Sequence, residues 1–200
     1  EDTPSPREEI AGLRVVGTLQ DRYLIAEGLQ GLVLIDKNAA HRRVLFEALL
    51  QAADEEKTPQ QPLLIPLTLE LGHDDAKLMG RSLPSFEHLG FGIEHFGGNT
   101  YLVTAVPTQF PQTEIGTVLR DVLDDLRERT AGAPRPDDVR IARAACRHAV
   151  RPSDTLGPTE IRRLLEDLAA AEMPYTCPDG QPVLVNIPFR EIDKRFGRKL

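Results

Sequence analysis

The sequence predicts an α+β (mixed α/β) fold, because short β-rich runs and longer helical runs both occur along the chain. Three of the β-rich runs follow one another and are separated by turn residues; they cover 13–19, 22–27 and 31–36. This spacing is typical of an antiparallel meander. Further along, Gly97-Gly98-Asn99 joins the runs 91–96 and 100–106 as a hairpin.

Apolar residues recur at helical spacing in five other segments. These segments are 39–53, 74 to about 89, 115–129, 138–150 and the stretch that begins at Gly157-Pro158. Pro84 should kink or split the second of these helices. The strand-like segment 63–71 contains Pro66 and is therefore expected at the edge of a sheet. A strand at 183–187 and a short basic tail close the chain.

Composition limits the class of protein. Two hundred residues with 40% hydrophobic content suit one compact domain or two small subdomains. A formal charge of −7 opposes tight, unaided DNA binding, so weak DNA contact at most is expected. Two cysteines and no secretory signal indicate a reducing, cytoplasmic setting, and no apolar run approaches the roughly 20 residues of a membrane helix. Residues 1–10, which lack an initiating Met, are expected to be the remnant of a linker in a longer protein.

The segment 36–47 has the position of a functional site. Asp36 ends an apolar run and precedes a helix, and acidic ligands or bases are often placed at such junctions. On that helix, positions 38, 42 and 47 fall near one face or its edge and carry Asn, Arg and Glu. The residues alone leave open whether this is a working metal site or the remnant of one.

Four motifs in order give the chain a family resemblance. They are Asp36 to Glu47, similar to Asp-Gln-His-Ala-x-x-Glu-x-x-x-x-Glu; Gln61 to Pro66; Ala145-Cys146-Arg147; and Cys177 to Pro182, similar to Cys-Pro-His-Gly-Arg-Pro. Together they make the chain resemble the C-terminal dimerisation domain of bacterial MutL, a family of DNA mismatch repair proteins.

The resemblance implies a homodimer built from two subdomains. The inner dimerisation subdomain, a small sheet with helices, would comprise residues 11–60 and 139–200, with an outer, regulatory α/β subdomain inserted at 61–138. It also implies an absent N-terminal ATPase that binds ATP with Mg²⁺ and clamps on mismatched DNA. The implied partners are the DNA polymerase sliding clamp, MutS and a separate strand-nicking nuclease or helicase. The implied location is the bacterial cytoplasm, at the nucleoid during repair.

The resemblance also implies a metal site in family members that nick DNA, and this chain departs from it. Asn38 stands for a His, Arg42 for a Glu and Asp179 for the last His, while Cys177 remains. An amide is a poor ligand for Zn²⁺ or Mn²⁺. A +2 ion about 5 Å from Arg42 would be repelled by about 7 kcal/mol at an effective dielectric of about 20. We therefore expect a degenerate endonuclease site, with no cofactor and no catalytic residue in this domain.

An enzyme remains the alternative interpretation. In it, a divergent metal-dependent DNA-nicking endonuclease would use Asp36, Glu47, Cys177 and Asp179 with Zn or Mn. Against it, Asp36 has a simple role as a helix N-cap, and Glu47 as a carboxylate that pairs with Arg43. If the family arrangement holds, Cys146 would lie near Cys177. The two would then be reduced cysteines of a small core or, if their Cα atoms lie within about 7 Å, could form a disulfide.

Two further sets of residues are candidates for partner contacts. The clamp-binding motif comprises Gln61, Leu63, Leu64, Ile65 and Pro66, in which an amide offers polar contacts, leucines fill an apolar slot and proline keeps the segment extended. Its alternative is an edge strand whose leucines are core residues. The candidate DNA contacts form an arginine stripe of Arg140, Arg143, Arg147 and Arg151, whose alternative is a solvated helix face that pairs with nearby acids. Phe196-Gly197-Arg198 matches a family Phe-x-Arg element and is expected to serve packing or dimer contacts.

Overall fold

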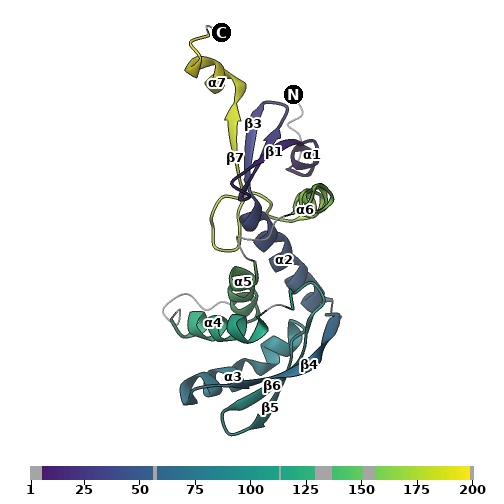
Figure 1. Cartoon of the computed structure of the whole chain (residues 1–200), viewed down its shortest axis with the longest axis vertical. Helices are drawn as coiled ribbons and strands as arrows, with labels where there is room; N and C mark the ends of the chain where they lie inside the picture. The colour runs from purple at the N-terminus through teal and green to yellow at the C-terminus, as the bar shows by residue number, and fades with distance from the viewer. Residues whose placement is uncertain (1–5, 56–57, 113, 129–136, 151–155, 199–200) are drawn as a thin grey trace. The chain divides into compact units, whose positions relative to one another are not determined.

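The computed structural model describes residues 6–55, 58–112, 114–128, 137–150 and 156–198. Helices and two small antiparallel sheets make up these residues, so the α+β class is confirmed (Figure 1). The chain divides into two compact units. We call Glu1–Val44 with Val150–Leu200 the first unit, and Leu45–Ala149 the second unit.

The sheet of the first unit contains the predicted meander. Its strands are β1 (Arg14–Leu19), β2 (Tyr23–Glu27), β3 (Gly31–Asp36) and β7 (Leu184–Pro188), hydrogen-bonded in the order β1-β2-β3-β7. All neighbours are antiparallel. A register shift between Val15 and Gly17 marks a bulge in the edge strand β1. The last strand of the chain therefore completes a sheet that the first three strands begin.

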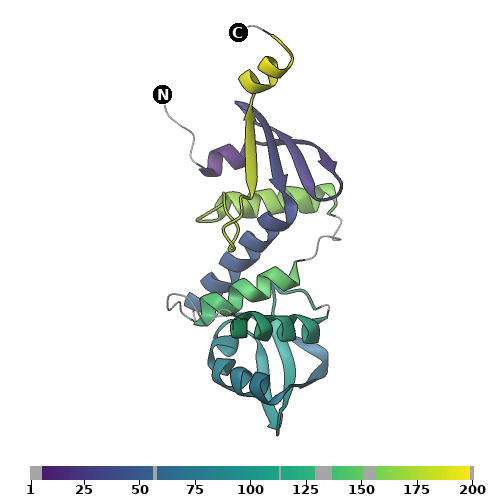
Figure 2. The same ribbon diagram turned by 90° about the vertical axis from the view of Figure 1, so that its left-hand side faces the viewer.

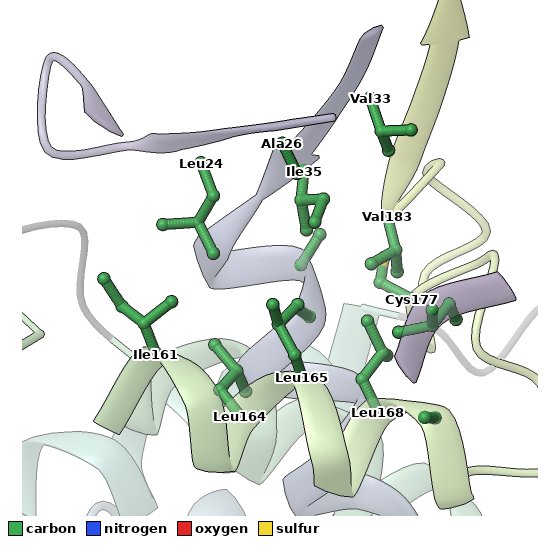
Figure 3. Packing of buried hydrophobic residues seen from close by; sticks show 14 residues of the cluster. Leu24, Ala26, Val33, Ile35, Ile161, Leu164, Leu165, Leu168, Cys177 and Val183 are labelled. Atoms are coloured by element: carbon green, nitrogen blue, oxygen red, sulfur yellow. The ribbon is translucent and has the colours of Figure 1, made fainter. Parts of the chain in front are cut away.

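One face of this sheet is buried against helix α6 (Pro158–Ala170). Figure 3 shows the apolar side chains that meet there; from the strands these are Leu24, Ala26, Val33 and Ile35, and from the helix Ile161, Leu164, Leu165 and Leu168. All eight are less than 10% exposed. Alternation along the strands explains the pattern, because every second side chain points to the same face.

Helix α1 (Pro6–Ala11) lies where the sequence predicted the end of a linker. It packs against α6, and Ile10 is only 1% exposed in the same apolar cluster as the sheet. The sequence did not predict this helix, because its residues are mostly charged and a single buried side chain in a short helix gives almost no periodic signal. Residues 1–5 of the predicted linker remnant lie outside the described residues.

Helix α2 (Lys37–Asp54) follows β3 directly and crosses from the first unit to the second between Val44 and Leu45. The sequence predicted subdomain boundaries at 60/61 and 138/139, so the first is later and the second earlier than the boundaries of the second unit. In the structure the C-terminal part of α2 and the helix α5 (Asp137–Ala149) belong with the second unit. Leu49 and Ile141 of these helices are fully buried, and periodicity cannot tell to which core a helix belongs.

The second unit has a three-stranded antiparallel sheet with strand order β4-β6-β5. Its elements are β4 (Gln60–Glu70), α3 (His73–His88), β5 (Gly92–Gly97), β6 (Thr100–Pro107), α4 (Ile115–Glu128) and α5. The predicted hairpin and the edge position of β4 are both confirmed. Helix α3 runs through Pro84 as one helix rather than splitting there. Rings of Phe86, Phe91 and Phe110 pack edge-to-face in this core.

The chain ends in a short helix that the sequence predicted only as a basic tail. Helix α7 (Phe189–Arg195) contacts β7 and contains no buried residue. Figure 2 shows it beyond the end of the four strands. Among the described residues no helix is long and apolar enough to span a bilayer.

Candidate functional site

The N-terminal part of α2 buries polar side chains. Lys37, Asn38 and Arg43 are 4%, 8% and 6% exposed. Arg43 Nε donates a hydrogen bond of 2.6 Å to the carbonyl oxygen of Thr176, which lies far along the chain in the same unit. Because a buried cation must find acceptors, this bond ties α2 to the loop that carries Cys177.

Asp36 is the N-cap of α2. One of its carboxylate oxygens accepts hydrogen bonds from the backbone N–H groups of Asn38 and Ala39, at 2.9 and 3.0 Å. The other carboxylate oxygen lies 3.6 Å from Arg22 Nε. The two backbone hydrogen bonds to one oxygen confirm the capping role predicted for Asp36.

Two of the positions at which the resemblance implies metal ligands hold side chains that suit a metal poorly, namely Arg42 and Asn38. Arg42 is half-buried, and its Nε is buried without a hydrogen-bond partner among the described residues. Asn38 offers a neutral amide in place of an imidazole. Within the described ranges no group of three or more His, Cys, Asp or Glu residues could hold a metal ion. Asn38 and Arg42 are therefore poor ligands for a divalent metal ion, and the loss of the metal site stays a prediction.

The remaining positions of this set lie in two places. Cys177 is 1% exposed and Asp179 half-buried, in a turn of the first unit where Gly180 takes a φ of +84°. The N–H of Gly180 donates to the Cys177 carbonyl, as the Pro-Asp-Gly sequence predicts for a tight turn. Half-buried Glu47 and fully buried Cys146 belong to the second unit. Both cysteines are free thiols.

The arginine stripe on α5 is engaged with its neighbour α4. Arg140 donates to the carbonyl of Leu126 at 3.0 Å, and Arg147 lies 2.9 Å from an oxygen of Asp125. His148 Nε2 lies 3.1 Å from the same carboxylate oxygen. Arg143 is half-buried, and Arg151 lies outside the described residues. The contacts of Arg140 and Arg147 belong to a helix face that pairs within the protein, and DNA contact by the stripe stays a prediction.

The segment Leu63–Pro66 forms a bulge in the edge strand β4. Between the pairs Pro62↔Ala105 and Leu67↔Val103, β4 advances five residues while β6 advances two, which leaves three extra residues in β4. Leu64 is 97% and Ile65 79% exposed. The alternative of a strand with core leucines therefore does not hold for these two residues. Gln61 Nε2 donates to the Phe110 carbonyl at 2.9 Å, which anchors the start of the bulge.

The outer face of the first unit's sheet, opposite α6, is apolar as well. It includes the cross-strand pairs Ile25↔Leu34 and Leu34↔Val185. Its apolar side chains are half-buried or exposed; they are Val16, Leu19, Tyr23, Ile25, Leu32, Leu34, Val185 and Ile187. In Figure 1 the labelled helices α1 and α6 lie to one side of these strands. In the sequence, the signal for this face is the unbroken apolar run 31–35, since such a strand is apolar on both faces.

An outer sheet face and a bulge that both expose large apolar side chains define the class of protein as an interaction domain. A model of the MutL C-terminal dimerisation domain matches residues 16–156, and the chain belongs to that family.

Curated relatives agree with this assignment. The chain is 37% identical over 203 aligned positions to the DNA mismatch repair protein MutL of Pelotomaculum thermopropionicum, covering 99% of this chain and 33% of that protein. It is 40% identical over 198 positions to that of Symbiobacterium thermophilum, covering 96% and 31%. It is 39% identical over 182 positions to that of Gemmatimonas aurantiaca, covering 90% and 30%. The chain thus spans about a third of the length of the curated relatives it matches.

Proposed function

We propose that this domain dimerises through the outer face of the sheet β1-β2-β3-β7 and couples the dimer to repair partners without cutting DNA itself. The observation that carries the first part is the apolar outer face in a chain that belongs to a dimerisation family. Val16 and Val185 are 53% and 51% exposed there, at opposite edges of the sheet. A face of this kind is stabilised when a second copy covers it, because apolar burial contributes about 25 cal/mol per Å².

Sedimentation equilibrium tests the outer face directly. Val16→Asp with Val185→Asp places two charges on it and should turn the dimer into a monomer, while circular dichroism stays unchanged. Phe96→Asp is a matched control, because Phe96 is 69% exposed but lies on β5 in the second unit. A dimer that survives the paired valine changes would place the interface elsewhere.

The exposed bulge is the proposed contact for the DNA polymerase sliding clamp. Leu64 and Ile65 present two neighbouring apolar side chains on an edge strand, and Pro62 and Pro66 flank them. Extended segments with such side chains bind apolar pockets, with the affinity of one short peptide. Gln61 takes part as the anchor that is already bonded to Phe110.

Calorimetric titration of the clamp into the dimer tests this contact. Leu64→Ala with Ile65→Ala should weaken binding at least about tenfold, since truncated hot-spot side chains cost more than about 1 kcal/mol each. Phe96→Ala, which removes an exposed apolar side chain on another strand of the same sheet, should leave the titration unaltered. Unchanged binding by the bulge variant would exclude it as the clamp contact.

The absence of nuclease activity rests on the metal-binding positions. Asn38, Arg42 and Asp179 replace three expected ligands, and one oxygen of Asp36 already accepts two backbone hydrogen bonds as the N-cap of α2. A nicking assay on supercoiled circular DNA with Mn²⁺ and the clamp should give no cleavage. Robust nicking that Asp36→Asn abolishes would instead establish the alternative, a divergent endonuclease.

A gain-of-ligand variant tests the same positions from the other side. Asn38→His, Arg42→Glu and Asp179→His together should raise the affinity for Zn²⁺ or Mn²⁺ in a calorimetric titration, because they remove a fixed positive charge, add an imidazole and a carboxylate, and exchange the Asp179 carboxylate for an imidazole. No change in metal affinity would show that these positions do not converge.

In the whole protein, this domain would hold two ATPase parts together as they clamp on mismatched DNA. It would pass the signal from MutS to a separate strand-nicking nuclease or helicase at the nucleoid. Pull-down of those partners by the whole protein, compared with the Val16→Asp, Val185→Asp variant, would test whether dimerisation is required.

A further inference from the structure

A stripe of apolar side chains on α7 has no covering element in the part of the chain that the structure describes. Phe189, Ile192 and Phe196 lie three and four residues apart and therefore share one side of the helix and its C-terminal cap. The two phenylalanines are 46% and 77% exposed. Exposed aromatic side chains in register on a helix are typical anchors of a protein interface.

A cavity of about 200 Å³ lies in the same unit, between α1 and the turn that joins β2 to β3. Leu13, Leu29 and Val33 line it together with backbone of the turn. Leu29 is 87% exposed beside it. Small-molecule sites measure about 300–1,000 Å³, so this cavity has the size to receive a side chain rather than a cofactor.

The charges of the two surfaces are complementary. Two carboxylates, Glu8 and Glu9, line the cavity. The segment 189–198 carries four basic and two acidic residues. Within it, both acidic residues already pair with arginines of the same segment, Glu191 with Arg195 and Asp193 with Arg198. Arg190 and Lys194, one helical turn apart and exposed, carry the excess positive charge.

The helix does not fill its own cavity. Among the described residues, none after Asn186 lines it. The direction of α7 is held where it starts: the Phe189 N–H donates to the Gln30 carbonyl at 3.0 Å. Gly31 packs closely on the backbone of Ile187: a Cβ added to Gly31 would lie 2.2 Å from the carbonyl oxygen of Ile187. Folding α7 back over the turn would break the hydrogen bond between Phe189 and Gln30 and the close packing of Gly31 against Ile187.

We propose that α7 is an exchanged arm, whose apolar stripe docks into the cavity beside Leu29 on the second copy in the dimer. This rests on the dimer proposed above. In a twofold dimer the contact occurs twice, because each copy offers one arm and one cavity. Val185 and Ile187 of the outer face lie on β7, the strand that leads directly into α7, so the proposed dimer surface and the arm are adjacent in the chain.

Cysteine cross-linking between two differently marked chains tests the exchange. Leu29→Cys chains, refolded together with Phe196→Cys chains and mildly oxidised, should give a covalent heterodimer. The native thiols are buried and give little background. Leu64→Cys replaces a side chain of similar exposure in the second unit and is the matched control. Cross-linking no stronger than in the control would overturn the proposal. So would a fast, intrachain disulfide in the double variant Leu29→Cys, Phe196→Cys.

A second measurement separates the arm from the outer face. Phe189→Ser with Phe196→Ser should raise the dimer dissociation constant about tenfold or more without changing the fold, because both side chains are exposed in the single chain. If this variant dimerises normally while Val16→Asp with Val185→Asp does not, the arm exchange fails and the outer face stands. If the arm variant weakens the dimer and the valine variant does not, the outer face fails instead.

Discussion

The segments 36–43 and 61–66 both depart from the usual pattern of apolar side chains inside and polar side chains outside: the first buries polar side chains, and the second exposes apolar ones. The first buries Lys37, Asn38 and Arg43. The second exposes Leu64 and Ile65 almost completely. Buried polar groups need partners inside the chain, whereas exposed apolar groups gain free energy from a partner outside it. We therefore expect a structural role for the segment that resembles an active site, and a contact with a partner for the segment that resembles an ordinary strand.

The largest effect expected from this comparison concerns Arg43. Arg43→Ala should lower the free energy of unfolding by about 2–3 kcal/mol, because it removes a buried charged hydrogen bond and leaves the Thr176 carbonyl without its donor. Urea unfolding followed by circular dichroism measures it. Arg42→Ala is the matched control on the same helix and should cost about 1 kcal/mol or less, since its Nε donates no bond within the described chain. Equal losses would remove the distinction between the two arginines.

A smaller effect is expected at Asp36, where the comparison predicts a cap rather than a ligand. Asp36→Ala should destabilise the protein by about 1 kcal/mol, as the loss of N-cap acceptors usually does. Asp36→Asn keeps an acceptor and should cost much less. Thermal unfolding with and without Mn²⁺ distinguishes the roles, because a metal ligand would give the wild type a metal-dependent shift that both variants lose.

A half-exposed polar pair should contribute less than these buried groups. His88 Nδ1 on α3 lies 2.8 Å from Asp138 on α5, and the two side chains are 46% and 29% exposed. This hydrogen bond outweighs burial and raises the pKa of His88. Burial opposes ionisation of Asp138, but hydrogen bonds from Ser85 and His88 outweigh it and lower the pKa of that carboxyl.

The sign of the resulting pH dependence follows from these directions. The contribution of His88 is complete below the unfolded histidine pKa of about 6.5 and is lost as pH rises through the higher folded pKa. With solvent screening we expect about 0.5 kcal/mol, seen as a fall in stability as the pH rises above about 6.5. His88→Gln should flatten that slope, whereas His73→Gln, on the exposed first turn of the same helix, should not. An unchanged slope in His88→Gln would assign the pH dependence to other groups.

The smallest effect on stability is expected at the bulge, although its side chains are large and apolar. Leu64→Ser with Ile65→Ser should change the free energy of unfolding by no more than about 0.5 kcal/mol, because neither side chain is buried. Leu69→Ser, on the buried face of the same strand, is the contrast and should cost several times more. A large loss at Leu64 and Ile65 would mean that the bulge packs within the protein and is not a free surface.

Most of the secondary structure could be predicted from the sequence because its signals are local. The meander, the 91–106 hairpin and the edge position of β4 follow from alternation, turn residues and proline. Asp36 as a cap follows from its place between an apolar run and a helix. Helices α1 and α7 were missed because they are short and charged, and one buried isoleucine or an exposed stripe gives too weak a period.

The sequence by itself determined the α+β class, the family and the chemical identity of each position, including Asn38 and Arg42 where metal ligands would stand. Only the tertiary structure decided which side chains are buried. It buried Lys37 and Arg43, exposed Leu64 and Ile65, and left the outer sheet face and the α7 stripe without cover in the described residues. Burial depends on what packs against a residue from distant parts of the chain, such as Thr176 against Arg43, and no local pattern carries that information.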